Sequence, residues 1–554
     1  MGINDLLTKG YFPEEIHPHF TSEDLASISA LILGQIDTLD PLTGSNRIIS
    51  KQVTFSTPKI KGYRRNLAIP NPLHYIRLSN TISTHWSEIV THCNKSSISL
   101  SKLKLNQGSN RAIVKPSFDL ANREKITRST GHRYLLKLDI TRCYHSIYTH
   151  SIPWALHTKP ISKANRRRNY FGNAIDEDCR KMQDGQTVGI PIGPDTSRVI
   201  SEIILAAVDF EIKSIIGHYV GIRVIDDYHL YFRTQGDLEI AKAVIQKVLR
   251  SYELELNQSK EKTNSLPEII ESNWFNELRN FRFSNAWKTQ RKDLIAFFDK
   301  VFSLANQYPN DLVLTYAMSK IRATVFNPKN WNMLQAYLLN SLIVESKVLP
   351  YVAQMLLSYN KQLYRLNKMI IKDALEEMIL FHSSLNNDFE VSWSLWILKS
   401  LDISLSENVA RIVSESTNDI VILTALDLHN AGLIPVGLNL SIWETLATED
   451  NLYSEHWLLA YEAKKKGWLS VHTNYLDNNH FFKILKDNNI EFYKPNRELD
   501  LKSVKVASGE FYFANEEHVE EEDTEDESLV SGVTPSIPVL IPLTSMSEDE
   551  DLPF

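Results

Sequence analysis

The sequence contains little cysteine and no long apolar run. Its 554 residues include three cysteines, Cys93, Cys143 and Cys179, whose spacing fits neither a metal site nor a disulfide framework. No stretch approaches the roughly 18 uninterrupted apolar residues of a membrane span. The opening residues also lack the basic and then apolar layout of a signal peptide. We therefore expect a cytoplasmic protein without membrane association.

Charge is divided unevenly along the chain. The formal net charge is −7, with 43% hydrophobic and 23% charged residues, which is typical of a soluble globular protein. Thirteen acidic residues and no Lys or Arg lie in 516–554, so residues 1–515 carry a formal charge of +6. A mildly basic body suits a polyanionic partner, and the acidic end is typical of a disordered tail.

The apolar pattern changes along the chain. Up to about residue 285, short β-like runs mix with helical stretches and Gly-Pro breaks, which predicts an α/β or α+β region. From about 286 to 475, amphipathic helices follow one another, joined by short polar breaks. Successive helices of this kind favour a bundle or an α-solenoid, although the sequence shows no fixed-period repeat.

Two adjacent aspartates stand in an otherwise apolar segment, GIRVIDDYHLYF (221–232). The flanking β-branched and aromatic residues predict two short strands, with Asp226 and Asp227 at the turn between them. Upstream, the β-like run 134–138 ends at Asp139. A strand-end carboxylate beside a carboxylate pair can hold two magnesium ions ~3.5–4 Å apart. The alternative is a solvated turn, since Asp is a common turn residue.

Three segments, in this order, resemble the catalytic motifs of reverse transcriptases, a family of right-handed palm polymerases. They are LDITRCY (138–144), GIPIGPDTS (189–197) and RVIDDY (223–228). Two positions depart from the common family form: Ile192 stands where Gln is frequent, and Val224 stands where Tyr or Phe is frequent. The resemblance implies nucleotidyl transfer with two Mg²⁺ ions per site, for which Mn²⁺ can substitute.

Three features narrow the resemblance to one group of reverse transcriptases: the stretch YHSIYTHSIPWAL (144–156), the GIPIGP form of the loop and the long helical C-terminal region. They look like bacterial antiphage reverse transcriptases of the "unknown group", which includes abortive-infection proteins of the AbiK and AbiA kind. The implied fold is α+β: palm, fingers and thumb, then an all-α, HEAT-like repeat domain and a disordered acidic tail. The implied domains are a helical N-terminal extension (1–50), fingers and palm (51–285), thumb-like helices (286–335), the repeat domain (336–515) and the tail (516–554).

The resemblance also implies catalytic roles. Asp139, Asp226 and Asp227 would bind the metals together with Ile140. A lysine after the acidic hairpin would protonate the leaving pyrophosphate; Lys260 and Lys262 compete for this role, and Lys262 is taken as the candidate. Two further basic residues, Arg111 and Lys115, are expected near the template or the nucleotide.

Nucleotide binding is expected at three places. The basic fingers segment 61–78 would grip the triphosphate, because Arg can contact phosphate through two hydrogen bonds. The Gly-Pro loop would approach the base or sugar closely. By resemblance, an aromatic residue five positions after the first Asp would exclude a 2′-hydroxyl and favour deoxynucleotides. The expected residues are Lys61, Arg64, Arg65, Ile140, Tyr144, Gly189, Pro191 and Gly193.

The resemblance implies a DNA polymerase that adds dNTPs in bacterial antiphage defence. Protein priming, template-independent synthesis and synthesis on a noncoding RNA stay open as alternatives, as does action beside a second reverse transcriptase subunit; a homo-oligomer is expected. One rival is a templated retroelement reverse transcriptase, and another is a catalytically silent palm that serves as an RNA-binding scaffold. A metal-dependent nuclease is the third, and it leaves the Gly-Pro loop, Tyr144 and the fingers arginines unexplained.

Overall fold

The computed structural model describes residues 2–42, 48–106, 111–471 and 473–507, with only the backbone for Lys61. Met1–Gly509 forms one compact unit. The predicted acidic tail lies outside the described residues. Across the described ranges, none of the helices combines the length and apolarity needed to span a bilayer.

The strands of the described residues form two sheets. One is a hairpin of β1 (Val53–Pro58) and β2 (Arg64–Ile69), which pair antiparallel. The other has four strands in the order β4-β5-β3-β6, with every neighbouring pair antiparallel. Its strands are β3 (Tyr134–Asp139), β4 (Val220–Val224), β5 (Asp227–Phe232) and β6 (Lys262–Ser265).

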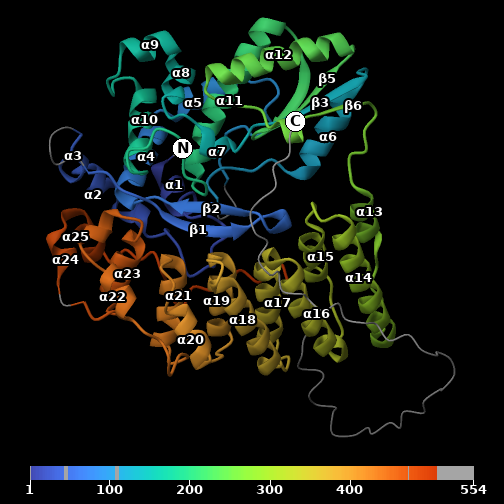
Figure 1. The fold of residues 1–554 in the computed structure, drawn as a ribbon, viewed down its shortest axis with the longest axis vertical. Helices are drawn as coiled ribbons and strands as arrows, with labels where there is room; N and C mark the ends of the chain where they lie inside the picture. Colours follow the sequence, from blue (N-terminus) through green and yellow to red (C-terminus); the bar gives the residue numbers. More distant parts are fainter. Residues whose placement is uncertain (1, 43–47, 107–110, 472, 508–554) are drawn as a thin grey trace, which may run out of the picture. The chain divides into compact units, whose positions relative to one another are not determined.

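Helices surround these sheets and make up the C-terminal half (Figure 1). Those before β6 are α1 (Ile3–Lys9), α2 (Ser29–Leu33), α3 (Ile36–Leu39), α4 (Pro72–Thr84), α5 (Trp86–Cys93), α6 (Phe118–Ser129), α7 (Cys143–Ser146), α8 (Ser151–His157), α9 (Lys159–Ala164), α10 (Phe171–Lys181), α11 (Asp195–Ile216) and α12 (Gln235–Ser251). Those after β6 are α13 (Asn273–Asn280), α14 (Trp287–Gln307), α15 (Val313–Arg322), α16 (Trp331–Val344), α17 (Leu349–Lys361), α18 (Lys368–Ser383), α19 (Asp388–Ser400), α20 (Glu407–Val413), α21 (Asp419–Asn430), α22 (Ser441–Leu446), α23 (Trp457–Lys466), α24 (Tyr475–Asn478) and α25 (His480–Asp487).

Helix α11 forms the centre of the part around the four-stranded sheet. It packs against α5, α8 and α12. Its apolar side chains, such as Ile203 and Leu205, are fully buried and join a core with Leu136 of β3 and Leu230 of β5. A helix that is apolar on nearly all sides must be covered on nearly all sides. The run VISEIILAAV therefore places α11 inside the fold, in the same core as side chains of the sheet.

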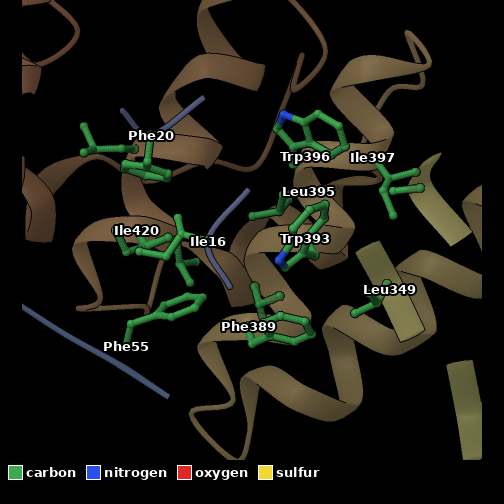
Figure 2. Packing of buried hydrophobic residues seen from close by; sticks show 14 of the residues in the cluster. Ile16, Phe20, Phe55, Leu349, Phe389, Trp393, Leu395, Trp396, Ile397 and Ile420 are labelled. Atoms are coloured by element: carbon green, nitrogen blue, oxygen red, sulfur yellow. The ribbon is translucent and has the colours of Figure 1, made fainter. Parts of the chain in front are cut away.

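A second core joins the N-terminal segment and the β1–β2 hairpin to the C-terminal helices (Figure 2). Phe20 and Phe55 contribute to the same apolar cluster as Phe389 and Trp393 of α19. The Trp393 indole N–H also donates to the Glu15 carbonyl at 2.8 Å. In Figure 1 the helices from α16 to α21 lie beside one another below this hairpin. The mixture of helices and sheets agrees with the α+β prediction, whereas a HEAT-like repeat stays a prediction.

Candidate active site

The three predicted aspartates converge at one edge of the four-stranded sheet. Asp139 ends β3 and Asp227 begins β5, and the antiparallel register sets these two residues directly opposite each other. Asp226 occupies the turn between β4 and β5. One carboxylate oxygen from each residue lies within 4.8 Å of the other two. Like charges directly opposite in a strand pair are destabilising, so this aspartate cluster requires positive charge nearby.

Burial and mutual repulsion both act on the cluster. The pKa of Asp226 is raised by burial and by the charge of Asp139. Burial, the charge of Asp226 and a hydrogen bond with Asp139 raise the pKa of Asp227 to about 7. A divalent cation would relieve this cost, and Mg²⁺ prefers carboxylate oxygens. Three carboxylates this close together therefore fit such an ion, and Asp139, Asp226 and Asp227 are the residues that would hold it.

The segment that follows α12 closes around Asp139. Ile140 pairs with Leu256 in an isolated antiparallel bridge, and the Asn257 N–H donates to the Asp139 carbonyl at 2.8 Å. The Asn257 side chain donates to Asp139 Oδ2 at 3.2 Å. Ile140 is buried, and its role in binding metal or nucleotide stays a prediction, whereas sequence reasoning missed Asn257. The available signal was its position in LELNQSKEKTNSLP (254–267), the segment that also supplied the candidate lysines.

Lys260, rather than Lys262, lies at the aspartate cluster. Its Nζ is 3.0 Å from Asp139 Oδ1. Burial lowers the pKa of Lys260, but the hydrogen bond to Asp139 and the charges of Asp227 and Asp226 outweigh burial, so the pKa is raised overall. Lys262 lies on the edge strand β6, where it pairs with Lys137, and its side chain is exposed. The choice of Lys262 is therefore corrected in favour of Lys260.

Arg64 and Arg65, predicted to lie in the fingers, are on opposite faces of β2 because successive strand residues alternate in direction. Arg64 donates to Glu390 of α19 through two hydrogen bonds of 2.6 and 2.9 Å. Arg65 is exposed, and its charge acts on Asp226. Arg64 is therefore corrected from a nucleotide-binding residue to a structural one. Lys61 lies in the turn between β1 and β2, and its side chain is outside the described residues.

Lys59 is a basic residue near the aspartates that sequence reasoning missed. Its pKa is lowered by partial desolvation and by the charges of Arg65 and Lys260, while Asp226 and Asp139 act in the opposite direction. Its backbone N–H donates to the Tyr63 carbonyl at 2.7 Å, which closes the turn at the end of the hairpin. The signal was present in the sequence, since Lys59 lies two residues before the basic segment 61–78.

The Gly-Pro loop is tied to its surroundings on both sides. Gly189 has a φ of 88°, and its N–H donates to the Ile147 carbonyl at 2.8 Å. Gly193 has a φ of 132°, and a Cβ there would lie 2.6 Å from Pro13 Cγ. Packing against the N-terminal segment thus explains the glycine at 193. Pro191, between the two glycines, is buried.

The two basic residues expected near the template or nucleotide instead bond to the protein. Arg111 is buried and donates to Asp195 Oδ1 at 2.5 Å, to the Phe12 carbonyl at 2.8 Å and to the Gly193 carbonyl at 2.7 Å. Lys115 pairs with Glu14. These contacts fasten the N-terminal segment to the start of α11, so the expectation for both residues is corrected.

Tyr144 lies on α7, five residues after Asp139, and is partly buried. Burial and the neighbouring Cys143 raise the pKa of its phenol above the ordinary value. Its carbonyl accepts from the Ile190 N–H at 2.9 Å, which joins α7 to the Gly-Pro loop. The side chain lines a small cavity together with Ser101, Ser201 and Ile225. The structure therefore brings Tyr144 beside the turn that carries Asp226.

Residues 72–292 match the model of the family described as "Reverse transcriptase (RNA-dependent DNA polymerase)". The chain therefore contains a reverse transcriptase domain, the domain of RNA-directed DNA polymerases. The matched range includes the aspartate cluster, the Gly-Pro loop and Lys260, whereas the β1–β2 hairpin and most C-terminal helices lie outside it. A search of curated proteins finds no match.

Solved structures of telomerases show a distant likeness. Apo telomerase from Candida tropicalis, truncated from its C-terminal domain, is 13% identical with a TM-score of 0.31, over 46% of this chain and 57% of that chain. Apo telomerase from the same organism is 10% identical with a TM-score of 0.32, over 74% and 71% of the two chains. Telomerase from Candida albicans with a fragment of telomeric RNA is 10% identical with a TM-score of 0.28, over 62% and 68%. The chain thus spans less than two thirds of the truncated telomerase.

Proposed function

We propose that this protein is a Mg²⁺-dependent DNA polymerase that adds dNTPs to a 3′ hydroxyl. The observation that carries the proposal is the aspartate cluster, whose three carboxylate oxygens lie within 4.8 Å of one another. Asp139, Asp226 and Asp227 would hold two magnesium ions, which would supply activation of the attacking hydroxyl and stabilisation of the leaving pyrophosphate. A simple solvated turn would not require Asp139 at the end of a neighbouring strand.

The surrounding side chains have distinct proposed roles. Lys260, hydrogen-bonded to Asp139 at 3.0 Å, would hold the proton that passes to the leaving pyrophosphate. Lys59 and Arg65, whose charges act on the aspartates, would bind the triphosphate. Tyr144 would discriminate against ribonucleotides, with Ile140, Gly189 and Pro191 forming the adjoining walls.

The biological setting that we propose is bacterial antiphage defence, in the cytoplasm. The segment YHSIYTHSIPWAL (144–156), the GIPIGP form of the loop and the long run of helices after β6 support this proposal. The helical region would be a HEAT-like scaffold that mediates self-association or binds a noncoding RNA or a second reverse transcriptase subunit. The primer would be a protein hydroxyl or a nucleic acid end, with or without a template.

The second candidate is a conventional polymerase that copies an RNA template. The description of the matched family, RNA-dependent DNA polymerase, favours it. Both candidates use the same aspartate cluster, and they differ in whether added template is required.

Incorporation of labelled dNTPs and NTPs by the purified protein with Mg²⁺ tests both candidates. The reactions are run with no added nucleic acid and with a primed RNA template, and the products are then treated with protease. Asp226→Asn and Asp227→Asn are expected to abolish incorporation. Asp184→Asn is a matched control, because Asp184 is exposed and has a φ of 57°, which Asn tolerates.

Three outcomes are distinct. Product without template that stays bound to protein supports protein-primed defence synthesis. Product only with primed RNA supports the templated alternative. No aspartate-dependent product in any reaction would overturn the polymerase proposal and leave a silent scaffold.

A further inference from the structure

The turn that carries Asp226 contains a residue in an unfavourable conformation. Val224 pairs with Asp227, so Ile225 and Asp226 alone form the turn. Ile225 has a φ of 56°, which glycine adopts easily and which a β-branched side chain rarely adopts. Such a conformation persists only where the surroundings hold it.

Both backbone groups of Ile225 are held by side chains. Its N–H donates to Ser101 Oγ at 2.9 Å, from a segment 124 residues earlier in the chain. Its carbonyl accepts from Arg223 Nη1 at 2.9 Å. A residue placed directly before the metal-binding pair is therefore fixed from two sides. We call these two bonds the turn lock.

Arg223 is itself fixed from several directions. Its guanidinium is fully buried and donates to the two Glu202 carboxylate oxygens at 3.0 Å each and to Asp209 at 2.8 Å, both on α11. Its backbone N–H donates to the Ile98 carbonyl and its carbonyl accepts from the Leu100 N–H, each at 2.8 Å. A buried charge is tolerated only with this degree of pairing. The arginine thus connects the turn to α11 and to the segment that carries Ser101.

The same network reaches the strand after the turn. Tyr228, which follows Asp227 and pairs with Arg223 across the hairpin, donates its hydroxyl to Asp209 at 3.0 Å. Ser96 donates to Asp209 at 2.6 Å from the other side. Ser96 therefore belongs to the network but makes no bond to Ile225, which makes it a matched comparison for Ser101.

We infer that Ser101 and Arg223 are positioning residues: they hold Ile225 in its left-handed conformation so that the Asp226 and Asp227 carboxylates face Asp139. Ser101 lies outside the three polymerase motifs, and its hydroxyl accepts the hydrogen bond from the Ile225 N–H in the turn. The catalytic consequence rests on the proposed polymerase function, whereas the conformational part does not.

Ser101→Ala tests the inference more cleanly than a change at Arg223, because removing the arginine would leave two buried carboxylates unpaired. Ser101→Thr keeps the hydroxyl, and Ser96→Ala weakens the same network away from the turn. Hydrogen exchange at the Ile225 amide is measured without metal, and Mn²⁺ binding is measured by electron paramagnetic resonance.

We expect Ser101→Ala to accelerate exchange at Ile225 and to weaken Mn²⁺ binding by about three- to tenfold, the value of one hydrogen bond. Ser101→Thr should restore both, and Ser96→Ala should change neither beyond twofold. Replacing Ile225 by glycine should reduce the effect of Ser101→Ala, because glycine adopts the turn without help. In active protein, kcat should fall while KM for dNTP stays the same.

The inference that the turn lock positions the aspartates would be overturned by either of two results. One is unchanged hydrogen exchange at the Ile225 amide in Ser101→Ala, and the other is a loss of Mn²⁺ binding in Ser96→Ala as large as that in Ser101→Ala. If the wild-type protein binds no Mn²⁺ while Ser101→Ala still accelerates exchange at the Ile225 amide, the result would instead count against the proposed polymerase function. The two failures are therefore distinguishable.

Discussion

Arg64 and Glu390 lie 326 residues apart and form a two-bonded salt bridge, with Nη1–Oε1 at 2.6 Å and Nη2–Oε2 at 2.9 Å. Glu390 is 1% exposed and also accepts from Ser346 at 2.7 Å. Nearby, Asp388 accepts from the Ser56 N–H at 2.8 Å. The hairpin that presents Arg65 is thus fastened to α19 through its opposite face.

This salt bridge predicts that the two neighbouring arginines have separable roles. Arg64→Ala should destabilise the protein by about 3–5 kcal/mol, because it leaves the buried Glu390 carboxylate uncompensated. Arg65→Ala should leave the free energy of unfolding within about 0.5 kcal/mol of the wild type and raise KM for dNTP on the order of tenfold. Urea unfolding and steady-state kinetics measure the two effects. A raised KM with unchanged stability in Arg64→Ala would contradict the assignment.

Lys260 and Lys262 can be compared directly. Lys260→Gln should lower kcat on the order of 10²-fold with little change in KM, because the variant lacks the proton donor beside Asp139. Lys262→Gln, on the exposed strand β6, should keep kcat within about twofold of the wild type. Single-turnover incorporation measures both variants. The reverse order of effects would restore Lys262 as the candidate.

Metal binding should depend on pH through Asp227, whose pKa burial and the neighbouring carboxylates raise to about 7. Below that pH a proton occupies the carboxyl that the metal requires, so the affinity for Mn²⁺ should fall by up to about tenfold per pH unit. Titration calorimetry in buffers of different ionisation enthalpy should detect close to one released proton at pH 6 and fewer at pH 8. Binding that does not vary between these pH values would exclude Asp227 as a ligand.

Glu462 should make stability depend on pH in the region of α23. It is fully buried, its carboxylate accepts from the Phe492 N–H at 2.6 Å, and burial raises its pKa from 4.5 to about 7, against the lowering effect of Lys466. The folded state therefore binds this proton more tightly than the unfolded state does. The resulting stabilisation is complete below about pH 4.5 and is lost as the pH rises through 7.

Glu462→Gln removes this titration while keeping an acceptor for Phe492. Relative to the wild type, the variant should gain stability between pH 5 and pH 7 by up to about 1.4 kcal/mol per pH unit. Chemical unfolding of both proteins at these pH values measures the difference. If the difference in the free energy of unfolding between the variant and the wild type does not change from pH 5 to pH 7, Glu462 has an ordinary pKa in the folded protein.

The acidic centre could be anticipated because its signals are local. Alternating β-branched and aromatic residues around two aspartates predict a hairpin, and strands β4 and β5 meet at that turn. The same reasoning applies to β3, which ends at Asp139 as expected. The helices after β6 were also visible in the amphipathic pattern, since a helix repeats its apolar face within a few residues.

The sequence by itself therefore determined the carboxylates, the strands that carry them and the helical character of the C-terminal half. Only the tertiary structure decided which charged residues reach the aspartates. Arg64 and Arg65 are neighbouring residues of the same type. Because side chains alternate along a strand, Arg64 binds Glu390, whereas the charge of Arg65 acts on Asp226. Ser101 carries no sequence signal at all, because its bond to Ile225 joins segments 124 residues apart. The local pattern of apolar residues indicates which face of a helix or strand is buried. Which residues pack against that face depends on the tertiary structure.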